Sequence, residues 1–141
     1  MGILSRGQQK HIEQRIREYH QMKAAVAEWR DGVIRGSRMP DARTRKTTAA
    51  DPTASKAIRL ANPPKHIREY QAWIDAIDVV RVKLQGSQED CLFDKWYWAK
   101  RVSPDRVTLS LHISRATLFN WRCEVALRVA IQAEKRGVFV A

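Results

Sequence analysis

The residues in this sequence that are best suited to recognise a ligand lie within the run ISRATLFNW at positions 113–121. If this run is helical, Arg115, Ala116, Phe119 and Asn120 share one side of the helix, because residues four apart lie one turn above each other. An arginine can donate two hydrogen bonds to guanine, and an asparagine can form two with adenine. We therefore predict that these four residues contact base edges in the major groove of DNA.

The flanking residues predict that this helix is the second one of a helix-turn-helix motif over residues 104–128. Ser103 is suited to cap a first, short helix that Pro104 begins, because proline at the first helical position loses no needed hydrogen bond. The turn is predicted at 112–113, and Ser114 is suited to cap the second helix. The alternative is an ordinary helical hairpin with a basic outer surface, which leaves the capped turn and the local charge unexplained.

The second helix also has a predicted buried side. Leu118, Trp121 and Val125 follow one another at steps of three and four residues, which is the spacing of a helix that packs against a core. We expect Trp121 to be a core residue and its loss to unfold this part of the chain.

Positive charge gathers around the motif. Between Lys95 and Arg128 there are seven basic residues and two acidic ones. The positive end of a helix dipole also favours phosphate at the start of the second helix. We predict that the DNA backbone is contacted by Lys100, Arg101, Arg106, Ser114, Thr117 and Arg122. Such contacts position a protein on DNA without reading its sequence.

The N-terminal segment, residues 1–34, is predicted to form one long amphipathic helix over 8–34. Its apolar residues recur at steps of three and four: Ile12, Ile16, Tyr19, Met22, Val26, Trp29 and Val33. This spacing is close to a heptad repeat. The stripe could pack against the rest of the chain or against a second copy, and we expect a homo-oligomer because paired modules read two half-sites.

Residues 35–50 have a different character and are predicted to form a basic linker. They show no periodicity and carry a single acidic residue. The basic residues that could act as an arm on the phosphates or in the minor groove are Arg38, Arg43, Arg45 and Lys46. A solvated loop without a ligand is an equally favoured interpretation.

Residues 51–141 are predicted to form a helical domain that ends in the helix-turn-helix. Asp51 and the proline after it predict the start of a short helix that ends near Ala61. Further helices are predicted over 65–84 and 88–101. Trp98 is the one tryptophan that we expect to be exposed. The predicted fold class is therefore all-α.

The overall composition narrows the classes of function. The chain has 141 residues and a formal net charge of +11, which favours a polyanionic partner. Its two cysteines and four histidines show no metal-binding spacing, and the sequence contains no glycine-rich phosphate loop. We therefore expect no enzymatic activity, no metal and no cofactor. An apolar run long enough to span a membrane is absent, so we expect no membrane partner and a cytoplasmic location.

Residues 91–128 resemble the C-terminal part of phage-encoded late-gene activators of the RinA/ArpU type, which are similar to region 4 of sigma factors. The resemblance rests on an aromatic run at 96–98, a basic connector at 100–101 and the ISRATL sequence at 113–118. The resemblance covers roughly residues 51–136 and is weaker in the N-terminal third. It implies a sigma region 4-like helix-turn-helix and an activator of phage or prophage late genes, for packaging or lysis, in a bacterial host cell. It also implies double-stranded promoter DNA as the ligand and bacterial RNA polymerase as a partner.

A phage small terminase subunit, which binds packaging-site DNA, is the main alternative. Such proteins also combine a helix-turn-helix with oligomerisation helices, but the DNA-binding module usually comes first, whereas this chain has the reverse order. A nucleoid-associated or recombinase accessory protein that binds by charge alone is a third class, and the capped helix with Arg115 and Asn120 disfavours it.

Overall fold

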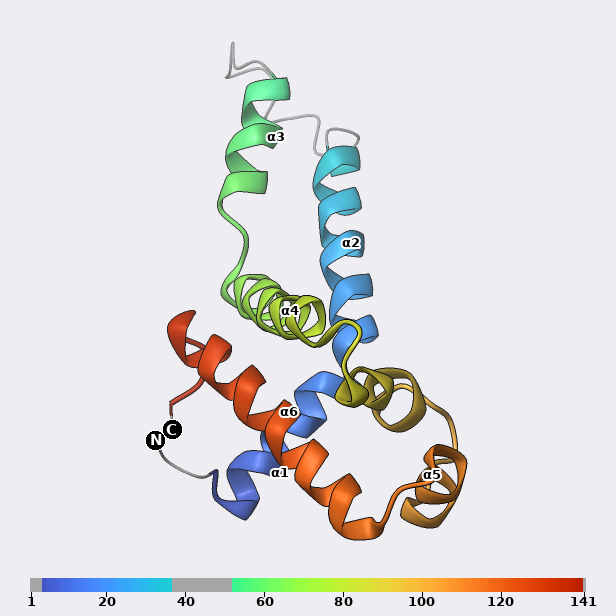
Figure 1. The fold of residues 1–141 in the computed structure, drawn as a ribbon. Coiled ribbons are helices and arrows are strands. Elements are labelled where there is room, and N and C mark those ends of the chain that lie inside the picture. Colours follow the sequence, from blue (N-terminus) through green and yellow to red (C-terminus); the bar gives the residue numbers. More distant parts are fainter. Residues whose placement is uncertain (1–3, 37–51, 141) are drawn as a thin grey trace. The chain divides into compact units, whose positions relative to one another are not determined.

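The computed structural model describes residues 4–36 and 52–140, and within these ranges all regular structure is helical (Figure 1). This confirms the predicted all-α class. The four basic residues of the predicted arm (Arg38, Arg43, Arg45 and Lys46) and the predicted cap Asp51 lie outside the described residues. No helix in the described ranges combines the length and the apolar composition needed to cross a lipid bilayer.

The chain divides into two compact units, which we describe separately. The larger unit comprises residues 1–20 and 72–141, and the smaller unit comprises residues 21–71. Residues from the two ends of the sequence thus belong to one unit, and the segment 1–34 does not form a unit of its own.

The larger unit contains α1, the start of α2, most of α4, two short irregular helices, α5 and α6. Their bounds are α1 Arg6–Arg17, α2 Tyr19–Arg35, α4 Lys65–Leu84, η3 Gln88–Asp90, η4 Phe93–Tyr97, α5 Pro104–Leu111 and α6 Arg115–Lys135. The smaller unit contains the rest of α2, α3 (Pro52–Ala61) and the start of α4. The predicted helices over 52–61 and 65–84 are confirmed. Prolines lie at or just before the start of each, which explains these boundaries.

The single long helix predicted over 8–34 is wrong, because the chain leaves the helix at Glu18 and divides into α1 and α2. Ser5 and Gln8 form a capping box at the start of α1, and Glu18 has φ −82° and ψ 1° at its end. The apolar spacing continues through the break, and Ile16, Tyr19 and Met22 are all buried. Periodicity alone therefore does not reveal the break. Trp29, farther along the same stripe, is only half-buried.

The predicted helix over 88–101 is correct only in part, because the chain is helical through Tyr97 but irregular, and the helical structure ends before residue 101. A 3-10 turn at 88–90 leads into η4, a π-helical segment in which the Trp98 N–H donates to the Phe93 carbonyl at 2.9 Å. The wider turn buries Phe93, Trp96 and Tyr97 together. The chain then leaves the helix, and Arg101 takes a left-handed conformation (φ 54°) that an α-helix cannot contain.

Trp98 is half-buried, which differs from the expected exposure. Its indole N–H donates to the Ile16 carbonyl at 2.8 Å, and its ring stacks on Tyr19 with the centroids 5.1 Å apart. The guanidinium group of Arg81 lies 4.9 Å from the ring centroid. These contacts connect the end of η4 to α1, the start of α2 and α4.

The core of the larger unit is built around α6, which contacts both α1 and α5. Its fully or nearly fully buried residues are Leu118, Val125, Ala126, Val129, Ala130 and Ala133. They recur at steps of three, four and seven, as expected for a helix that buries one side. Trp121, which we expected in the core, is half-buried instead.

Candidate nucleic-acid interface

The connection between α5 and α6 is a tight turn with capped helices on both sides. The Ser103 hydroxyl accepts from the Arg106 N–H at 3.2 Å, and the Ser114 hydroxyl accepts from the Thr117 N–H at 3.0 Å. Both predicted serine caps are therefore present. Between them, His112 takes a left-handed conformation (φ 58°, ψ 44°) that ends α5 and lets the chain turn into α6.

The first turns of α6 separate an exposed side from a buried side. Arg115, Ala116, Phe119 and Asn120 are all exposed, whereas their neighbour Leu118 is 2% exposed. Phe119 is 56% exposed, so it lies outside the core. The four residues that we predicted to contact bases thus share one open side of the helix.

The guanidinium group of Arg115 is paired with Asp105 on α5. Its Nε lies 3.1 Å from Oδ1 of Asp105, and a second nitrogen contacts the same oxygen. The side chains are 67% and 78% exposed. An ion pair in this setting is worth about 0–1 kcal/mol, so a ligand can displace it at low cost.

The predicted phosphate contact at Arg122 is disfavoured by an internal ion pair with Glu13. Its Nε and terminal nitrogen donate to the two carboxylate oxygens of Glu13 at 3.0 and 2.9 Å, and its guanidinium group lies over the Trp96 ring at 4.8 Å. Glu13 on α1 is only 3% exposed. Arg122 is committed to this interior pair, so we exclude it from the candidate interface.

Tyr97 completes the group around Glu13. Its hydroxyl donates to Oε2 of Glu13 at 2.8 Å. Burial, followed by the nearby negative charge of Glu13, raises the pKa of Tyr97 well above its ordinary value. The hydrogen bonds to Glu13 likewise raise the pKa of Arg122. Three elements, α1, η4 and α6, are thus joined by one buried carboxylate.

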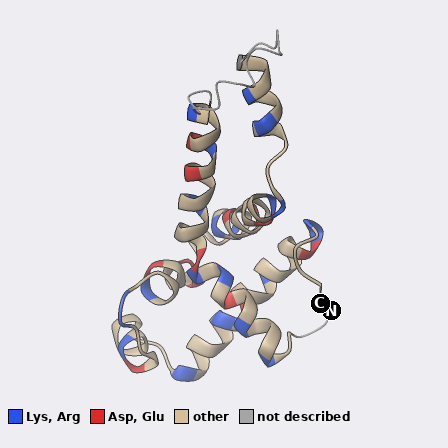
Figure 2. Cartoon of the chain, turned by 180° about the vertical axis from the view of Figure 1, so that it is seen from behind, with Lys and Arg blue, Asp and Glu red and all other residues tan. Residues whose placement is uncertain are grey.

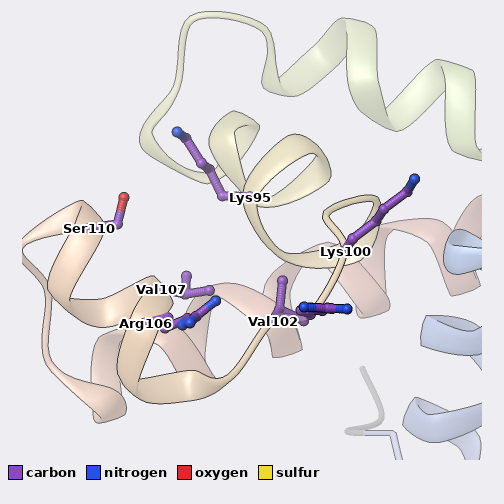
Figure 3. Close-up of a pocket in the computed structure, with 7 residues that line it drawn as sticks. Lys95, Lys100, Val102, Arg106, Val107 and Ser110 are labelled. Carbon is purple, nitrogen blue, oxygen red and sulfur yellow. The ribbon is translucent and has the colours of Figure 1, made fainter.

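The other predicted phosphate-binding side chains occupy two places. Ser114 and Thr117 lie at the start of α6, where the Ser114 hydroxyl donates a hydrogen bond to the Thr117 hydroxyl at 2.9 Å. Lys100, Arg101 and Arg106 line a single open hollow of about 170 Å³ before and along α5 (Figure 3). We call it the basic hollow; Val102, Val107 and Ser110 complete its lining together with a fourth basic residue, Lys95.

Lys95 was not predicted to contact phosphate, and the sequence placed it on a regular helix. In the structure it projects from η4, because Phe93, Trp96 and Tyr97 occupy the buried side of that segment. One signal could have drawn attention to it. No acidic residue stands three or four positions away from Lys95, so it has no helical ion-pair partner.

The seven basic residues between positions 95 and 128 fall into two groups. Arg115, Arg122 and Arg128 pair with Asp105, Glu13 and Glu124 respectively. The other four form no ion pair with any described residue, and they are the four that line the basic hollow. Figure 2 shows the corresponding blue segments on the connection before α5 and along α5.

Comparisons with known proteins add no assignment: no protein-family model, curated protein or solved structure gives a significant match to the chain. In the described part of the chain, no cluster of histidine, cysteine, aspartate or glutamate could hold a metal ion. The interpretation of the site therefore depends on its own geometry and charge.

Proposed function

We propose that this chain is a sequence-specific DNA-binding transcription regulator in which α5, the turn at 112–113 and α6 act as a helix-turn-helix. One observation carries the proposal. The capped start of α6 exposes Arg115, Ala116, Phe119 and Asn120 on one side while Leu118 anchors the other side in the core. A helix that enters the major groove needs this combination of an open side and a fixed inner side.

Each of the four exposed side chains has a chemically suitable partner in the groove. Arg115 would leave Asp105 and donate two hydrogen bonds to guanine, and Asn120 would pair with adenine. Ala116 and the exposed ring of Phe119 would contact thymine methyl groups. Lys100, Arg101 and Arg106, with the start of α6 at Ser114 and Thr117, would contact the backbone.

The more specific assignment follows the resemblance of residues 91–128 to late-gene activators of the RinA/ArpU type. It makes the protein an activator of phage or prophage late genes in the cytoplasm of a bacterial host, with promoter DNA and RNA polymerase as partners. We also propose a homo-oligomer. The smaller unit offers apolar surface for self-association, because Ile34 and Ile58 are 47% and 63% exposed.

The test is to incubate the protein with sheared DNA from its source genome at near-physiological salt and to sequence the retained fragments, because non-specific phosphate binding fades under these conditions. An Arg115→Ala/Asn120→Ala double variant serves as the matched control. A sharp site upstream of an operon that the double variant fails to retain supports a promoter-binding regulator. A site at a packaging locus would instead favour a small terminase subunit. Equal retention of all fragments, or retention of none, would refute sequence-specific DNA binding.

A further inference from the structure

The basic hollow gathers positive charge that nothing in its lining compensates. Lys95, Lys100, Arg101 and Arg106 are exposed, and none of the residues that line the hollow is acidic. Like charges at this density repel one another and destabilise the folded state. In the same stretch of sequence, each of the other three basic residues has an acidic partner. The hollow therefore has the electrostatics of an anion-binding site.

The backbone at the hollow is also unusual. Arg101 has φ 54°, a left-handed conformation that is unfavourable for a residue with a Cβ. This left-handed residue lies between η4 and the Ser103 cap of α5, and it is itself part of the lining. Backbone of this kind is concentrated at binding sites, where the surrounding structure maintains it.

The arrangement of the side chains indicates what kind of anion would fit. Figure 3 shows the Arg106 side chain extending toward Val102, and Val102 and Val107 add apolar lining to the hollow. Lys95 and Lys100 extend from different segments, and Figure 3 shows their ammonium groups apart and directed away from Arg106. Arginine guanidinium groups, which can donate two parallel hydrogen bonds, are typical of phosphate recognition together with lysine ammonium groups. The Ser110 hydroxyl adds one more hydrogen-bond donor.

We propose that the basic hollow binds a phosphate group and that Lys95 and Arg106 are its principal ligands. The source we assign is a backbone phosphate of the bound DNA, beside the groove that α6 enters. This part of the inference rests on the proposed function. A free phosphate compound is the other source with the same chemistry, and the experiment separates the two.

The first measurement is the salt dependence of DNA affinity, with a retained genomic fragment and an unrelated fragment of equal length. Each phosphate contact contributes roughly 0.9 to the slope of log K against log salt concentration. We expect Lys95→Gln to reduce the slope by about 1, and Lys95→Gln/Arg106→Gln by about 2, equally on both fragments. Lys83→Gln, which removes an exposed charge on α4 outside the hollow, should leave the slope unchanged.

The second measurement is a titration of the full chain with pyrophosphate, followed by the methyl resonances of Val102 and Val107, with sodium chloride at matched ionic strength as the reference. Saturable shifts that disappear in Lys95→Gln/Arg106→Gln support a phosphate site. If they occur while the salt slopes of all variants agree, the phosphate comes from a free compound and the DNA source is refuted. If neither the slope nor the shifts depend on Lys95 and Arg106, the inference is overturned. Failure of the wild-type chain to prefer any DNA sequence would refute the proposed function, and the pyrophosphate titration would still decide the site.

Discussion

Arg122 on α6 donates hydrogen bonds to both carboxylate oxygens of Glu13 on α1, at 3.0 and 2.9 Å, although the two residues are 109 positions apart in the sequence. Glu13 is almost completely buried and also accepts from the Tyr97 hydroxyl. The pair fixes α1 against the helix that carries the proposed base-contacting residues. It thereby connects the start of the chain to the geometry of the candidate interface.

Glu13→Ala should lower the free energy of unfolding by about 3–5 kcal/mol, because it leaves the charge of Arg122 partly buried without its partner. Urea denaturation followed by tryptophan fluorescence measures the change. Glu28→Ala, at an exposed position of α2, is the control and should change stability by less than about 0.5 kcal/mol. Equal stability of the two variants would contradict the structural role of the pair.

The raised pKa of Tyr97 predicts a loss of stability in alkaline solution. The folded state favours the protonated hydroxyl, so the stabilisation is complete below the ordinary tyrosine pKa of about 10 and declines as the pH rises beyond it. Denaturation midpoints measured across this range should fall in the wild-type chain and fall less steeply in Tyr97→Phe. Parallel curves for both proteins would show that Tyr97 does not contribute to the pH dependence.

Two adjacent residues of α6 should behave in opposite ways. Leu118→Ala should cost about 2–5 kcal/mol of stability, because Leu118 is 2% exposed. Phe119→Ala should change stability little, because the Phe119 ring is 56% exposed, but it should reduce discrimination between DNA sequences. Thermal melts and binding to matched and mismatched fragments test both expectations. A large loss of stability in Phe119→Ala would assign this ring to packing instead.

Asp105 should influence recognition through Arg115 rather than through stability. Asp105→Asn weakens an exposed ion pair, so unfolding should change by less than about 1 kcal/mol. The variant should bind unrelated DNA more tightly, because a negative charge near the backbone is removed, and its ratio of specific to unrelated binding should fall. Titration of both fragments with each protein measures the ratio. An unchanged ratio would show that the pair with Asp105 does not restrain Arg115 from contacts with unrelated DNA.

The parts of the fold that the sequence predicts well are those with local boundary signals. Prolines and serine caps mark α3, α4, α5 and α6, and the structure has these helices where such residues predict them. The break at Glu18 has no such signal, because the apolar spacing continues across it. The π-helical turn at η4 was missed for a similar reason, since buried aromatic residues there are compatible with an ordinary helix.

In the candidate site, too, the residues that depend on local signals are predicted well and those that depend on distant contacts are not. The exposure of Arg115 and Asn120 follows from helix phase, which the sequence contains. The interior role of Arg122 depends on Glu13 in a distant helix, and periodicity does not reveal such a partner. Lys95 lies on η4, which departs from a regular helix, and it lines the basic hollow. Long-range pairing and irregular backbone are thus the features that helical periodicity does not predict.

The central claim is that the exposed side of α6 reads a DNA sequence. The most direct test is to change every base pair of a retained site singly and to measure the affinity of the wild-type chain and of Arg115→Ala for each fragment. We expect Arg115→Ala to lose about 1–3 kcal/mol on the intact site and to become indifferent to one particular base pair. Uniform weakening across the whole set, with the pattern of base preference preserved, would contradict the account and limit Arg115 to a contact with the backbone.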